Sequence, residues 1–125
     1  MRHVNLAALG FLLLFAAPAF AQDATVVDSD HYKVEFENDQ VRVLRITYGP
    51  GEKSVMHWHP NSVAVILGDG QMRMHMPDGT TEDFESSHGD AEWAEAVTHL
   101  PENVRDESFE VILVELKSPP EEGCM

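Results

Sequence analysis

The sequence has a single cysteine, Cys124, next to the end of its 125 residues. One cysteine excludes a disulfide bond within the chain. The fold must therefore be stabilised by its core, helped by a bound metal ion or by self-association. We interpret Cys124 as a thiol in a loose tail, with pairing to a second molecule as the alternative.

Basic residues are also few: 8 Lys and Arg face 22 Asp and Glu, which gives a net charge of −14. Such a chain repels phosphate backbones and anionic lipids, so we expect no nucleic-acid partner and no binding to membrane surfaces. The acidic residues are scattered along the chain. We interpret them as a solvated surface, with an acidic pocket for a cationic substrate as the alternative.

No apolar run is long enough to span a bilayer comfortably, which takes about 20 residues. The run at residues 6–17 follows Arg2 and His3 and precedes Ala19-Phe20-Ala21, a small-x-small cleavage pattern. We therefore predict a signal peptide over residues 1–21, and a periplasmic or secreted location without membrane contact after cleavage. An uncleaved anchor is the alternative. Residues 22–125 then form a single domain, with its core at about 31–117.

A sustained helical period is missing after residue 21. Apolar residues instead alternate with polar ones, or form short runs, between turns marked by Gly, Pro, Asn and Asp. We predict strands at residues 31–37, 41–48, 53–59, 63–67, 71–76, 81–85 and 108–116, a strand or bend at 92–99, a turn at 100–103 and a loose lead-in at 22–30. This pattern predicts an all-β fold, a barrel or a sandwich.

Two histidines one residue apart, His57 and His59, follow the turn formed by Gly49, Pro50 and Gly51. Residues i and i+2 of a strand point to the same face, with Cα atoms roughly 6.6 Å apart at about 3.3 Å per residue. Two imidazoles at that spacing can bind one ion, because a metal–nitrogen bond is about 2.0–2.1 Å long. The pair alone is a weak signal, and a third histidine downstream strengthens it.

The chain resembles the cupin superfamily, in particular its small single-domain members, over residues 34–117. The two motifs of that family match at Gly51, His57, His59 and Gly68, and at Gly89, His99 and Asn103. The resemblance implies a small antiparallel β-barrel, the double-stranded jelly roll. It also implies a divalent transition metal, Fe, Zn, Mn or Ni, bound by His57, His59 and His99.

The family's motif glutamate is missing, because Val63 and Ala64 occupy the positions where it would fall. Glu95 could replace it if it shares a strand face with His99. Without that carboxylate, the three histidines could also be plain polar residues that line the barrel.

The resemblance implies a metal-dependent enzyme of the dioxygenase or isomerase type, acting on a small organic molecule. One alternative is a non-catalytic periplasmic barrel that binds or senses a small molecule. Another is a structural or partner-binding protein that has lost its site. The substrate cannot be read from the sequence.

Three methionines, Met72, Met74 and Met76, share one face of a predicted strand. We interpret them as core packing, with a soft-metal stripe as the alternative. Arg73 and His75 then face outward. In the opposite register Arg73 would line the pocket, where it could hold a substrate carboxylate.

Four further side chains have predicted positions. Trp58, between the two histidines, should point away from them, to the outer surface or to a homodimer contact. We expect Trp93 on the surface or at the rim of the pocket, and His31 and His88 exposed to solvent.

Overall fold

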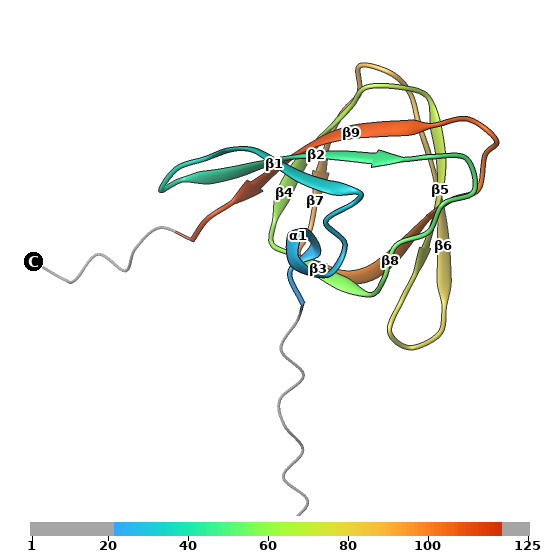
Figure 1. The fold of residues 1–125 in the computed structure, drawn as a ribbon, viewed down its shortest axis with the longest axis horizontal. Helices are drawn as coiled ribbons and strands as arrows, with labels where there is room; N and C mark the ends of the chain where they lie inside the picture. The colour runs from blue at the N-terminus through green and yellow to red at the C-terminus, as the bar shows by residue number, and fades with distance from the viewer. Residues whose placement is uncertain (1–21, 119–125) are drawn as a thin grey trace, which may run out of the picture.

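The computed structural model describes residues 22–118. The predicted signal peptide and Cys124 lie outside the described residues. The described part of the chain is built from nine strands in two antiparallel sheets (Figure 1). The predicted all-β jelly roll is thereby confirmed.

The two sheets differ in size and together contain all nine strands. The larger has the order β1 (Tyr32–Glu37), β2 (Val41–Tyr48), β9 (Phe109–Leu116), β4 (Ser62–Ile66) and β7 (Ala91–Ala94). The smaller has the order β3 (His57–His59), β8 (Val97–Asn103), β5 (Gly70–His75) and β6 (Thr81–Ser86).

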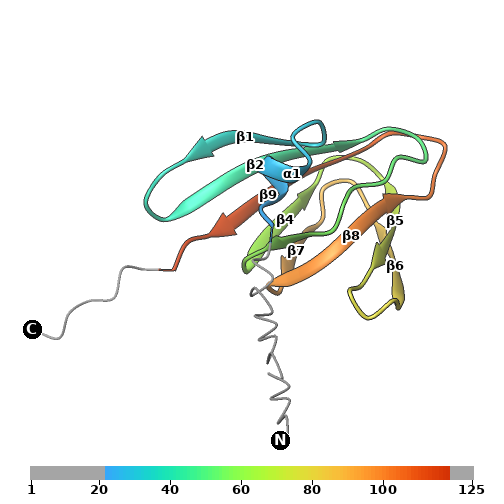
Figure 2. The same ribbon diagram turned by 60° about the horizontal axis from the view of Figure 1, so that its bottom comes forward.

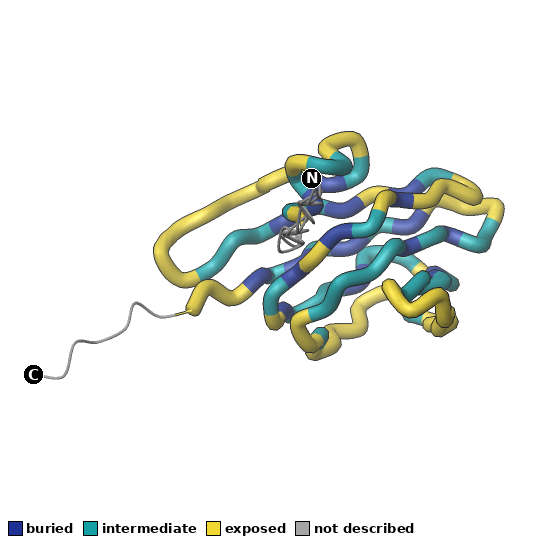
Figure 3. The backbone as a smooth tube through the Cα atoms, turned by 90° about the horizontal axis from the view of Figure 1, so that it is seen from below, coloured by how far each residue is buried: buried dark blue, intermediate teal, exposed yellow. Residues whose placement is uncertain are grey.

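The core lies between the inner faces of the two sheets. In β2, Leu44, Ile46 and Tyr48 are buried at alternate positions, and β9 buries Phe109, Val111 and Leu113 in the same way. Because successive strand residues point to opposite faces, this alternation assigns one face of each strand to the interior. Figure 3 shows buried positions alternating along these strands, while the β1–β2 hairpin end is exposed.

The first strand departs from the predicted half-buried pattern. Val34 and Phe36 are 49% and 54% exposed, although the alternation predicted both on a buried face. The β1–β2 hairpin extends beyond the body of the molecule (Figures 1 and 2). A register shift between Val34 and Phe36 also places Phe36 opposite Val43, on the outer face, because one inserted residue reverses the side-chain direction.

Three further segment predictions are wrong. The strand predicted at residues 53–59 forms only at its end, as β3, with an isolated bridge at Lys53. Residues 22–30 contain a helical turn, α1 (Ala24–Val27), whose first turn is capped by the Asp23 carboxylate accepting from the Thr25 backbone N–H. Residues 100–103 continue β8 instead of turning. Pro101 is tolerated there because β8 is paired along β5 at that point, with only the isolated Lys53–Glu102 bridge on its other side.

The two lateral sides between the sheets are flanked by different elements. On one side α1 packs against β1 and β3, beside the histidine strand (Figure 1). On the other side the edge strands β6 and β7 are joined by a short loop, in which the Gly89 N–H donates to the Ile66 carbonyl. No helix among residues 22–118 has the length and apolarity needed to cross a bilayer.

Candidate metal centre

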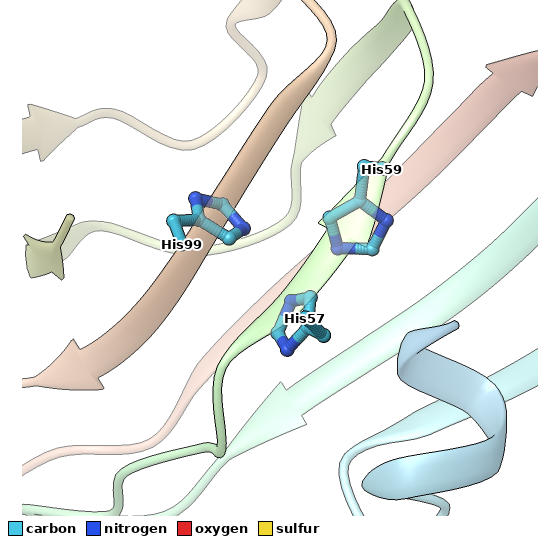
Figure 4. A group of neighbouring side chains, drawn as sticks. All are labelled: His57, His59 and His99. Carbon is cyan, nitrogen blue, oxygen red and sulfur yellow. The ribbon is translucent and has the colours of Figure 1, made fainter. Parts of the chain in front are cut away.

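Three histidines from two paired strands meet inside the barrel. His57 and His59 lie on β3 and are almost fully buried, while Trp58 between them is exposed on the outer side. His99 lies on β8 directly opposite His57. One ring nitrogen from each of the three lies within 4.8 Å of the others, and Figure 4 shows the rings facing a common point.

The hydrogen bonds of His57 and His59 determine which nitrogen is free. The Nδ1–H of His57 donates to the Val55 carbonyl at 2.8 Å, and Nδ1 of His59 lies 2.7 Å from Oε2 of Glu115. An imidazole that donates through Nδ1 keeps its lone pair on Nε2. Both Nε2 atoms therefore have the form that binds a metal ion.

Two ring nitrogens of the group have no partner. Nε2 of His57 and Nε2 of His99 are buried and make no hydrogen bond with the described residues. A buried polar atom without a partner costs about 1–3 kcal/mol. Two such atoms facing the same point fit a cation better than they fit a packed core.

Burial keeps these two imidazoles neutral. Desolvation, followed by the effect of neighbouring His59, lowers the pKa of His57 to about 4. Desolvation, with His59 and His57 next, lowers the pKa of His99 to about 3. Because metal ligation needs the unprotonated ring, both rings are ready for an ion at neutral pH without releasing a proton.

Behind His59 lies a buried carboxylate that the sequence analysis missed. Glu115, only 2% exposed, accepts from His59 and also from Nε of Arg42 at 2.7 Å. Nη2 of Arg42 in turn lies 2.7 Å from Oδ2 of Asp23. Burial alone would raise the pKa of Glu115, but the bonds from His59 and Arg42 hold it below its ordinary value, so the carboxylate is charged.

A second set of contacts supports His57 and corrects the prediction for His31. Ser54 Oγ lies 3.2 Å from Nδ1 of His57 and donates to Asp28. His31 was predicted to be solvent-exposed, but its side chain is only 14% exposed. It lies between Asp28 and Glu52 and stacks on Tyr48 with ring centroids 4.5 Å apart.

Beside the histidines is a cavity of about 390 Å³, lined in part by His59 and His99. Met72, Met74 and Met76 also line it, so the predicted inward direction of the methionines is confirmed. Met72 belongs to the buried core and Met74 packs against it, as predicted, while Met76 is half-buried where it lines the cavity. Arg73 pairs with Asp83 and is not among the lining residues, which excludes it as a holder of substrate carboxylate in this cavity.

The remaining predicted residues lie outside the histidine group. Glu95 is exposed and accepts from the Trp93 indole, so it does not take the place of the missing motif glutamate. Trp93 is exposed and lines the cavity, as the rim alternative predicted. His88 is exposed, and His75 pairs with Glu102. The homodimer contact predicted for Trp58 stays a prediction.

The two antiparallel sheets and the inward histidines define a double-stranded β-helix protein with a candidate metal centre. No family model and no curated protein matches the chain. Solved structures do. A cupin domain from Bordetella pertussis is 25% identical over 70% of this chain and 92% of its own, with a TM-score of 0.65.

Two further structures show the same fold. A double-stranded β-helix protein from Klebsiella pneumoniae is 22% identical, covering 74% of this chain and 78% of its own, with a TM-score of 0.55. An RmlC-like cupin from Methanocaldococcus jannaschii is 17% identical, covering 71% and 83%, with a TM-score of 0.53. The chain has the double-stranded β-helix fold of the cupin superfamily.

Proposed function

We propose that this protein binds a divalent transition-metal ion through His57, His59 and His99 and uses it on a small organic molecule held in the adjacent cavity. The observation that carries the proposal is the pair of buried, unpartnered Nε2 atoms on His57 and His99. They lie with His59 in a group whose ring nitrogens are within 4.8 Å of one another.

The donor set favours particular ions. Three neutral imidazoles suit Zn and Fe(II), with Ni and Mn as further candidates, and lack the anionic oxygen that hard ions prefer. Three protein ligands leave coordination positions for water or a substrate oxygen, as in catalytic sites. A bound ion would act there as a Lewis acid. His59 and His99 line the cavity, so a molecule in it can reach the open positions.

A second candidate function is non-catalytic binding in the same cavity. It is favoured by the missing motif glutamate: Val63 and Ala64 offer no oxygen, and Glu95 is turned to Trp93. The carboxylate nearest the histidines, Glu115, is engaged by His59 and Arg42 and is not free to act as an acid or base. Both candidate functions use the same metal site, and they differ only in whether the bound molecule is chemically converted.

Metal content tests the proposal. Protein purified without chelators should contain about one equivalent of transition metal by plasma mass spectrometry. His57→Ala and His99→Ala should lose most of it, because each removes one of three ligands. His88→Ala, which changes an exposed histidine away from the site, should retain it. Equal metal content in all four proteins would refute the proposal.

We also propose that the protein is exported and that residues 1–21 are removed. The support is the sequence pattern alone: an apolar run followed by Ala19-Phe20-Ala21. Intact-mass measurement on protein from the periplasmic fraction should find a chain that begins at Gln22. A full-length chain in the membrane fraction would instead indicate an uncleaved anchor.

A further inference from the structure

The position of the cavity mouth follows from which lining residues are exposed. The exposed ones all come from β6, from β7 and from the two residues after β7: Glu82, Phe84, Glu92, Trp93, Glu95 and Ala96. The other lining residues are buried or half-buried. Since β6 and β7 are the edge strands of the two sheets, the mouth lies between these edges.

Each edge strand presents a carboxylate at this mouth. Glu82 lies directly opposite Met74, and Glu92 lies directly opposite Ala64. Met74 and Ala64 line the cavity, and directly opposed residues point to the same face of a sheet. Among residues 22–118, neither glutamate takes part in an ion pair.

Among residues 22–118, no positive side chain lines this cavity to balance these charges. Its lining residues include three glutamates, with Glu95 as the third, and no lysine or arginine. An opposite charge is attracted to these carboxylates, more strongly where the dielectric is lower than that of water. A carboxylate ligand would be repelled at the mouth, and no lysine or arginine of the lining would bind it.

The walls between the mouth and the histidines are apolar. Met72, Met74, Phe109 and Leu113 line them, and Phe84, directly opposite Met72, lies at the mouth. An aromatic face near a cation attracts it through the charge distribution of the ring. The volume of about 390 Å³ is near the lower end of the range of about 300–1,000 Å³ typical of ligand pockets.

We propose that the ligand of this cavity is a small, partly apolar organic amine, bound as a cation with its charged group at the mouth between Glu82 and Glu92. The inference rests on the proposed function, because it names the ligand class of the same cavity. The apolar body then lies against the methionines, and a neutral group faces the histidines.

Three probes of nearly equal size test the proposal: 2-phenylethylamine, 2-phenylethanol and phenylacetate. Calorimetric titrations use the zinc-loaded and the metal-free protein at pH 7 and low salt. In the metal-free protein we expect the amine to bind at least tenfold more tightly than phenylacetate, with the alcohol between them. This preference should shrink at high salt, since it comes from exposed carboxylates, and it should narrow in the zinc-loaded protein, where the ion can bind a carboxylate.

A matched pair of variants tests which carboxylates produce the preference for the amine. The double variant Glu82→Gln, Glu92→Gln should lose most of the preference for the amine. Glu85→Gln removes a charge from the outer face of the same strand, opposite Gln71, and should keep the preference. Equal loss in both variants would overturn the assignment of the mouth.

The outcomes also separate this inference from the proposed function. Phenylacetate binding as tightly as the amine to metal-free protein, or no binding of any probe, overturns the amine proposal while zinc binding still stands. Failure of the wild-type protein to bind zinc overturns the proposed function, and the amine preference is then measured on the metal-free protein alone.

Discussion

Glu115 shows how a single buried charge can orient a metal ligand. It accepts from His59 on one side and from Arg42 on the other, and it is almost fully inaccessible to solvent. An outer carboxylate of this kind holds the imidazole in one tautomer and one orientation. The series of polar contacts continues from Glu115 through Arg42 to Asp23. Residues of β9 and β2 and the residue that caps α1 therefore all help to hold the ring of His59.

We predict that Glu115→Gln lowers zinc affinity about 10–100-fold, the range expected when such a partner is changed. The amide keeps the size of the side chain but removes the charge facing His59. Glu110→Gln is the control, since Glu110 lies on the same strand and pairs with Arg45 at the surface. Competition with a zinc chelator measures both. Equal affinities in the two variants would contradict an orienting role for Glu115.

The low pKa values of His57 and His99 predict an acid-sensitive metal-free fold. The folded values are about 4 and about 3, against 6.5 in the unfolded chain. Below about pH 6.5 the unfolded state therefore binds more protons than the folded state, so stability falls as the pH is lowered toward the folded values. Each imidazole contributes up to about 1.4 kcal/mol per pH unit.

Urea unfolding in the presence of a chelator, between about pH 6.5 and 5, measures the sign and size of this pH dependence of stability. The free energy of unfolding should change more steeply with pH in the wild type than in His99→Asn, by up to about 1.4 kcal/mol per pH unit. His88→Asn should show the same pH dependence as the wild type. A His99→Asn slope as steep as the wild type would show that this ring is not buried as a neutral group.

Local spacing predicted part of the site, and long-range contacts supplied the rest. His57 and His59 were predictable because two residues on one strand share a face, and their family motif pointed to His99. Glu115 was missed because its contact with His59 spans 56 positions. A signal was nevertheless present: Glu115 is in phase with Phe109, Val111 and Leu113, so its side chain had to point inward.

At the scale of elements, the start of β5 shows how closely the two sheets approach. A Cβ atom on Gly70 would lie 2.2 Å from two ring carbons of Phe109, a buried residue of β9. Real atoms do not approach so closely, so a side chain at this position must displace the ring. Gly70 is therefore required by packing between the sheets.

We predict that Gly70→Ala destabilises the protein by about 1–3 kcal/mol, the usual cost of overpacking a core. Gly68→Ala is the matched control, because a Cβ there meets no atom within 4 Å. Its effect should stay within about 1 kcal/mol. Chemical denaturation of both variants measures the difference, and a Gly70→Ala protein as stable as its control would contradict the packing argument.

Strand prediction succeeded where strand-forming residues were frequent and failed where short-range signals competed. Residues 41–48 match β2 because an eight-residue run rich in β-branched residues leaves little ambiguity. Residues 100–103 looked like a turn because of Pro101, yet pairing with β5 overrides that local preference. The four-residue α1 is too short to show a helical period, and its Asp23 cap was its one local signal.

At the scale of the whole molecule, the candidate metal site would link ion binding to folding. His57 and His59 lie on β3 and His99 on β8, while their partner Glu115 belongs to the other sheet. An ion bound there would therefore tie together groups that separate on unfolding. Binding to the folded state alone stabilises it by mass action.

We predict that free zinc at about 100 times its dissociation constant stabilises the protein by about 2.7 kcal/mol. For a domain of roughly 100 residues this raises the melting temperature by more than about 10 °C. The variant His57→Ala, His99→Ala should show no comparable rise. Calorimetry checks both, and an unchanged wild-type melting temperature would argue against a folded-state zinc site.

The placement of the opening between β6 and β7 has a kinetic consequence. Among residues 22–118, the exposed lining residues of the cavity all lie at this opening, and α1 packs on the opposite flank, so we expect a ligand to enter and leave by the same route. If the protein is an enzyme, a product still bound there would exclude the next substrate molecule. Product release would then limit turnover as much as the chemical step does.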